Sequence, residues 1–201
     1  RPVTLALELD DTPLSTELQG FIDAMVALSG GKLKSVVVDG EYEKDDMGRS
    51  VFDVEHVLPA ARPCVRMVVD GKPTGLAFHG VPSGHEFNSF VLGLYNVAGS
   101  GQPLGDDLIE RAKSITDPLS IMILVSLTCT MCPETVLASQ RIASLNPAVR
   151  AEAYDVAHFP ELRDHYGAMS VPCIVITRAD GTQQVEFGKK SIPQMLELVG
   201  A

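Results

Sequence analysis

Hydrophobic and polar positions follow two periods along the chain, so strands and helices are expected to alternate. Residues 3–9 and 121–127 are mostly apolar runs whose length and composition are typical of buried strands. Residues 14–28 and 132–145 follow these runs with the 3.6-residue spacing of amphipathic helices. The pattern predicts an α/β protein.

The chain goes through this succession of elements twice. A further strand follows each helix, at residues 34–39 and 150–155. Pro63 and Pro172, which lie 109 positions apart (172 − 63), each open an apolar strand that ends in an Asp-Gly turn and leads to a second strand and a helix. Because the elements recur in the same order, we predict a duplicated β-α-β-α-β-β-α unit.

Each unit is expected to contribute to a mixed sheet. Its β-α-β start implies two parallel strands joined by a right-handed crossover, and its Asp-Gly turn makes the last two strands antiparallel. The second helix of the unit is predicted at residues 158–166 and 54–60, and the first half carries an insertion within residues 41–58. Helices should therefore cover both faces of the sheet.

Residues 99–105 are predicted to connect the two halves. Their Gly, Ser and Pro content is typical of a linker. They follow a predicted helix rather than a strand, which does not fit a dinucleotide-binding loop. We therefore expect one domain at residues 1–100 and another at residues 101–201, the second opened by a helix at residues 106–114.

The charge balance excludes several classes of partner. The 201 residues include 16 Lys and Arg against 26 Asp and Glu, a net charge of −10. Such a surface repels phosphates, so neither nucleic acid nor an anionic membrane is expected to bind. The longest apolar stretch, residues 119–127, is far shorter than the roughly 20 residues of a membrane span. The chain begins directly in strand-like sequence, so no leader peptide is expected.

Cys129 and Cys132 carry the candidate chemistry. They form a Cys-x-x-Cys motif between a predicted strand and a predicted helix. A thiol at a helix N-terminus faces free backbone N–H groups and the positive end of the helix dipole, and both favour the nucleophilic thiolate. Cys129 is expected to attack a disulfide and Cys132 to resolve the mixed disulfide. Four cysteines that include such a pair favour a reducing compartment, the cytoplasm.

Other interpretations of the cysteines remain. A zinc half-site would need two more ligands, and the five histidines show no paired spacing, so no metal is expected. A purely structural disulfide is the second alternative. Cys64 and Cys173 each begin a predicted buried strand and are expected to be core residues, although Cys173 follows the proline nearest the pair.

Val171 and Pro172 stand where a thioredoxin-like fold places a cis proline beside its disulfide. The backbone before such a proline can pair with an incoming chain as a β-strand does. The alternative is an ordinary trans proline that opens an edge strand. Pro63 should repeat the geometry without the chemistry, because the first half has no cysteine pair. Val171, Pro172, Thr128 and Thr130 are the predicted substrate-positioning residues.

Glu86 has two interpretations. The sequence Ser83-x-x-Glu86 matches a helix capping box, as Ser191-x-x-Gln194 does in the other half. Glu86 is also a candidate acid or base for the proton transfers of thiol exchange, because the strand at residues 119–127 offers no ionisable side chain.

Several stretches resemble the N-terminal domain of the NADH-dependent flavoprotein component of alkyl hydroperoxide reductase. They are Cys-Thr-Met-Cys-Pro at 129–133, Leu-Asn-Pro at 145–147, Ser-Val-Pro at 170–172 and the specific Gly-Val-Pro-Ser-Gly-His-Glu-Phe at 80–87. The resemblance covers residues 2–199. It implies two tandem thioredoxin-like folds that share one mixed sheet, with only the second redox-active.

The resemblance also implies a function. Electrons would pass from NADH through FAD and a second cysteine pair to Cys129 and Cys132, and then to the disulfide of a peroxiredoxin. Glu86 would lie near the nucleophilic cysteine and assist proton transfer. No Gly-x-Gly-x-x-Gly motif occurs, so this chain is expected to bind neither FAD nor NAD(H). Both cofactors are expected in further domains of a longer, homodimeric parent protein.

Two other functions stay open at this point. One is a stand-alone glutaredoxin-like reductase of protein disulfides, served by a separate flavoprotein. The other is a non-catalytic docking module with a regulatory disulfide. The dipeptide Thr130-Met131 also departs from the polar pair of enteric members of the family.

Overall fold

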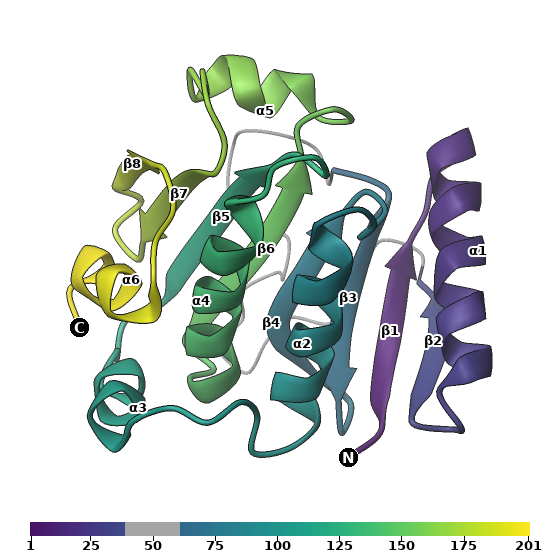
Figure 1. Cartoon of the computed structure of the whole chain (residues 1–201), viewed down its shortest axis with the longest axis horizontal. Coiled ribbons are helices and arrows are strands. Elements are labelled where there is room, and N and C mark those ends of the chain that lie inside the picture. Colours follow the sequence, from purple (N-terminus) through teal and green to yellow (C-terminus); the bar gives the residue numbers. More distant parts are fainter. Residues whose placement is uncertain (39–60) are drawn as a thin grey trace.

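The computed structural model describes residues 1–38 and 61–201, and these form one eight-stranded sheet with helices packed on it (Figure 1). The first half contains β1 (Val3–Glu8), α1 (Pro13–Leu28), β2 (Leu33–Val37), β3 (Cys64–Val69), β4 (Lys72–His79) and α2 (Glu86–Ala98). The second contains α3 (Asp106–Lys113), β5 (Leu119–Val125), α4 (Cys132–Leu145), β6 (Val149–Asp155), α5 (Pro160–His165), β7 (Cys173–Arg178), β8 (Gln183–Phe187) and α6 (Ile192–Val199). The helix predicted at 54–60 and the insertion at 41–58 lie outside the described residues.

The order of the strands confirms the predicted duplication. They run β2-β1-β3-β4-β6-β5-β7-β8 across the sheet, so each half has its strands in the order second, first, third, fourth. The pairs β1–β2 and β5–β6 are parallel, and β3–β4 and β7–β8 are antiparallel, as predicted. Parallel pairing of β4 with β6 joins the halves into one mixed sheet.

Local sequence accounts for several of these boundaries. Asp70 and Gly71 between β3 and β4 both have positive φ, 52° and 76°, as a type I′ two-residue hairpin turn requires. Helix α1 begins after Thr12, whose side chain accepts a hydrogen bond from the Ser15 N–H. Helix α6 begins at the capping box of Ser191 and Gln194, as predicted.

The core lies mainly between the sheet and the adjacent helices α2 and α4 (Figure 1). Alternate residues of β5 divide between the two faces. Ile121 and Ile123 face this main core, whereas Met122 and Leu124 join a smaller cluster with Phe159 on the other side. The carboxyl end of β5, where α4 begins, is thereby fixed from both faces.

A buried ionic network crosses the junction of the halves. Arg66 on β3 donates from Nε to Glu8 Oε1 (2.7 Å) and from Nη1 to Glu152 Oε1 (2.8 Å). His79 Nε2 on β4 lies 2.8 Å from Glu152 Oε2, and Arg150 Nη2 donates to Glu152 Oε1 (2.7 Å). Although burial opposes ionisation, Arg66 and Arg150 hold the pKa of the Glu152 carboxyl well below its ordinary value. Glu152 of the second half thus binds two side chains of the first.

Candidate active site

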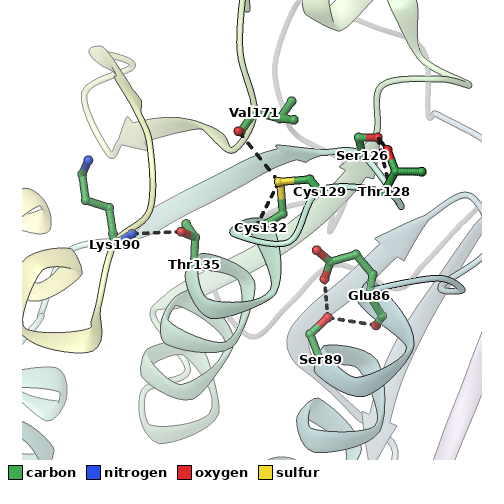
Figure 2. The surroundings of a disulfide bond; sticks show 9 residues. All are labelled: Glu86, Ser89, Ser126, Thr128, Cys129, Cys132, Thr135, Val171 and Lys190. Atoms are coloured by element: carbon green, nitrogen blue, oxygen red, sulfur yellow. Dashed lines mark hydrogen bonds between the residues drawn. A yellow bond between two sulfur atoms is a disulfide. The ribbon is translucent and has the colours of Figure 1, made fainter.

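Cys129 and Cys132 form a disulfide at the junction of β5 and α4 (Figure 2). Their Cα atoms are 5.6 Å apart. Cys132 is fully buried in the first turn of α4, whereas Cys129 in the preceding loop is partly exposed. A partner thiol or disulfide can therefore reach Cys129 but not Cys132.

The start of α4 places a hydrogen-bond donor on the exposed sulfur. The Cys132 N–H donates to Cys129 Sγ at 3.1 Å, and Pro133 follows in the first turn, where its missing N–H leaves no partner unsatisfied. A donor at this distance and the positive end of the helix dipole both stabilise negative charge on a sulfur. The geometry suits a sulfur that alternates between disulfide and thiolate.

Val171 lies across from Cys129. The Val171 carbonyl oxygen is 3.8 Å from Cys129 Sγ, and Figure 2 shows the two groups pointing toward each other. The Val171–Pro172 peptide bond is cis, as is Arg62–Pro63 in the first half, so both predicted cis bonds are confirmed. Pro172 itself is buried and its carbonyl accepts a hydrogen bond from the Gly188 N–H (3.0 Å), which fixes it to the end of β8.

The two threonines lie at the surface of the same loop. Thr128 and Thr130 are exposed, on either side of Cys129. The Thr128 hydroxyl is 3.1 Å from Ser126 Oγ, which also accepts from the Thr128 N–H (3.4 Å). Behind the loop, Thr135 Oγ1 accepts a hydrogen bond from the Lys190 N–H (3.0 Å), which ties α4 to the segment before α6. The threonines beside Cys129 thus border the sulfur without covering it.

The predicted capping box at Ser83 is wrong, and Glu86 does not cap its helix. Helix α2 begins two residues later than a Ser83 cap would place it, with His85 at the N-cap and no side-chain cap bond. The reason is a tertiary contact: the His85 N–H donates to the Leu127 carbonyl (3.0 Å), two residues before Cys129. Glu86 is thereby turned inward.

The Glu86 carboxyl is completely buried next to α4. Figure 2 shows it extending from the first turn of α2 toward the first turn of α4. One oxygen accepts a hydrogen bond from Ser89 Oγ, and the other, Oε1, has no partner. Burial raises the pKa of Glu86 from 4.5 to about 7; the bond from Ser89 opposes this and the charge of Asp155 adds to it. Near neutral pH this carboxyl can therefore both give and take a proton.

The other two cysteines are core residues, as predicted. Cys64 and Cys173 are free and fully buried. Burial raises the pKa of the Cys64 thiol well above its ordinary value and that of Cys173 to about 11. Such thiols are poor nucleophiles near neutral pH, so the reactive sulfurs of the described chain are those of the Cys-x-x-Cys pair.

Within residues 1–38 and 61–201, no group of three or more His, Cys, Asp or Glu side chains is placed to hold a metal ion. None of the helices in these ranges is both long enough and apolar enough to cross a bilayer. The candidate active site consists of the two sulfurs, the backbone groups beside them and the buried carboxyl of Glu86.

The chain is similar in sequence to known thioredoxin-like proteins. A thioredoxin-domain family matches residues 119–187. The F component of alkyl hydroperoxide reductase from Pseudomonas aeruginosa is 33% identical over 176 residues, and the same component from Staphylococcus epidermidis is 33% identical over 184. These alignments cover 88% and 92% of the chain but only 30% and 35% of the two relatives. The chain thus spans about a third of the length of such relatives.

Solved structures cover the chain more fully. A protein disulfide oxidoreductase from Aeropyrum pernix is 25% identical with a TM-score of 0.73, and 99% of this chain and 84% of that one superpose. The NTD_N/C domain of the alkyl hydroperoxide reductase component AhpF from Enterococcus faecalis is 38% identical with a TM-score of 0.85, covering 99% of this chain and 91% of that one. With the Cys-x-x-Cys disulfide in its thioredoxin-like second half, the chain belongs to the family of the N-terminal domain of AhpF, a component of alkyl hydroperoxide reductase.

Proposed function

We propose that the chain passes two electrons at a time, through Cys129 and Cys132, from a dithiol elsewhere in a longer AhpF protein to the disulfide of a peroxiredoxin. The observation that carries this proposal is the pair itself: one accessible sulfur and one buried sulfur at a helix N-terminus, with a backbone donor on the accessible one. A longer parent protein is supported by the relatives, which extend well beyond the part matched here.

The exchange proceeds in two balanced steps. The Cys129 thiolate attacks one sulfur of the partner disulfide, so a mixed disulfide forms and the other partner sulfur leaves as a thiolate that takes up a proton. Cys132 then loses its proton and attacks Cys129 Sγ, which releases the second partner thiol. The chain ends with the Cys129–Cys132 disulfide of the structure, and the partner gains two electrons and two protons.

We assign Glu86 to the proton transfers of these steps. Its carboxyl is buried and points toward the first turn of α4, which begins at Cys132 (Figure 2), and its pKa of about 7 lets it exchange a proton near neutral pH. The unpartnered Oε1 leaves one oxygen available for that proton. Val171 and Pro172 would position the partner backbone, together with Thr128 and Thr130, which flank Cys129 in the loop.

The residues that the structure describes do not fit FAD or NAD(H). The glycine-rich segment 99–105 joins α2 to α3, so it connects two helices and lacks the strand-to-helix turn that cradles a dinucleotide phosphate. We propose that the regions of AhpF beyond this chain hold both cofactors, in a homodimeric parent. The redox-inactive domain at residues 1–100 would then support the active domain at 101–201.

The test is to mix the reduced chain with the oxidised peroxiredoxin and to follow loss of thiols from the chain and gain of thiols on the peroxiredoxin. Transfer of one disulfide per chain is expected. A chain that reduces insulin but not the peroxiredoxin would be a general protein disulfide reductase. A pair inert toward both would be a regulatory disulfide.

A further inference from the structure

Two exposed methionines flank the accessible sulfur. Met131 lies between the two cysteines and is 51% exposed, and Met169 lies two residues before Val171 and is 95% exposed. Among the described residues these are the two methionines with exposed side chains. Val171 O is 3.8 Å from Cys129 Sγ, so the segment that carries Met169 meets the loop that carries Met131 at the accessible sulfur.

The two segments that carry this sulfur and Val171 contain no charged side chain. Segments 126–132 and 168–172 contain no Asp, Glu, Lys, Arg or His, although the whole chain has a net charge of −10. Glu134, the next exposed residue of α4 after Met131, forms an ion pair with Lys189 at 3.0 Å, so these two charges cancel. A partner segment that contacts these two segments meets threonine hydroxyls, backbone groups and methionine side chains.

Methionine suits a surface that must bind apolar side chains. Its unbranched, flexible thioether adapts to neighbours of different shape, and burial of apolar area is favourable at about 25 cal/mol per Å². The backbone of Val171 can at the same time pair with an extended segment. Residues next to the partner cysteine would then lie against Met131 and Met169.

We propose that Met131 and Met169 are specificity residues that select partners whose reactive cysteine lies in an extended segment with apolar side chains on either side of it. This inference rests on the proposed exchange chemistry at Cys129. It adds the class of substrate, which is a disulfide segment that is uncharged and apolar. The net negative charge of the chain would by itself favour a basic segment.

The experiment uses two peptides that differ at two positions. Each has one cysteine, held as a mixed disulfide with thionitrobenzoate, flanked by leucines in one peptide and by serines in the other. Attack by the reduced chain on the peptide sulfur releases coloured thionitrobenzoate, so the rate constant for each peptide is read directly. The leucine-to-serine ratio within one protein cancels any change in the intrinsic reactivity of Cys129.

The wild-type chain is expected to prefer the leucine peptide by about tenfold, with about threefold from each methionine contact. The double variant Met131→Gln and Met169→Gln should bring the ratio within about twofold of one, and Met131→Leu with Met169→Leu should restore the preference. Leu28→Gln is the control, because Leu28 is 89% exposed at the end of α1 in the redox-inactive half.

A wild-type ratio near one, or a full preference in the Met→Gln double variant, would overturn the inference. Failure of the exchange chemistry gives a different result: neither peptide would then release thionitrobenzoate faster than with the Cys129→Ser chain. Unchanged unfolding midpoints of the variants show that the exposed substitutions leave the fold intact.

Discussion

Replacing Glu86 by Gln removes a buried carboxyl whose ionisation the fold opposes. The side chain is fully buried, and burial raises its pKa from 4.5 to about 7. Below pH 4.5 the carboxyl is protonated in both the folded and the unfolded chain, so Glu and Gln are nearly equivalent. Between the two pKa values the folded chain keeps the proton that the unfolded chain has released, and stability falls as the pH rises.

The size of the effect follows from this interval. One pKa unit corresponds to 1.36 kcal/mol, so the wild-type chain loses about 3 kcal/mol between pH 4.5 and pH values above 7 because of Glu86. The Gln variant lacks this loss. We expect the two proteins to have similar free energies of unfolding near pH 4.5, and the variant to be about 3 kcal/mol more stable at pH 8.

Urea unfolding of both proteins from pH 4.5 to 8.5 measures this difference directly. Other titrating groups affect both proteins equally, so the difference between the curves isolates Glu86. Parallel curves across the range would refute the burial argument. A capping role predicts such parallel curves, because Gln serves a capping box as well as Glu does.

The same variant tests the role of Glu86 in exchange. Gln removes a negative charge that opposes the thiolate, so the pH profile of Cys129 alkylation should shift to lower pH while disulfide exchange slows. Superimposable alkylation profiles would remove Glu86 from the mechanism and leave it as a buried acid with an effect on stability alone.

Two further substitutions test how the site is supported. Glu152→Ala removes the carboxylate that accepts hydrogen bonds from Arg66 of the first half and Arg150 of the second. The free energy of unfolding at pH 7 should fall by about 3 kcal/mol or more, because both arginines lose this buried partner. A loss below about 1 kcal/mol in urea titrations would contradict this. Gly84→Ala places a Cβ 2.6 Å from the Leu127 carbonyl oxygen at a φ of +56°, so it should displace the loop before Cys129. Slower alkylation of Cys129 and a lower unfolding midpoint are expected, whereas unchanged values of both would mean that this close approach is not needed.

The sequence was sufficient for the repeated architecture because each element carries a local signal. Apolar strands, the Asp-Gly turn at Asp70 and the capping box at Ser191 depend on neighbours in the chain, and the structure confirms them. The Cys-x-x-Cys pair is equally local, since a spacing of three at a strand-to-helix junction brings the sulfurs together.

The features that sequence reasoning missed depend on distant partners. The boxes at Ser83 and Ser191 match the same pattern, but the contact of His85 with Leu127 delays the start of α2 and turns Glu86 inward. The network around Glu152 joins residues up to 86 positions apart, which only the pairing of β4 with β6 brings together. Polar residues within apolar strands were the available signal for that network.

Trapping of the mixed disulfide tests the central claim, that Cys129 attacks and Cys132 resolves. The reduced Cys132→Ser chain is mixed with the oxidised peroxiredoxin, and the covalent product is mapped by mass spectrometry after non-reducing digestion. The account predicts a stable mixed disulfide through Cys129 and none with Cys129→Ser, because the buried Cys132 cannot reach a partner. A product that forms only in Cys129→Ser and runs through Cys132 would contradict it.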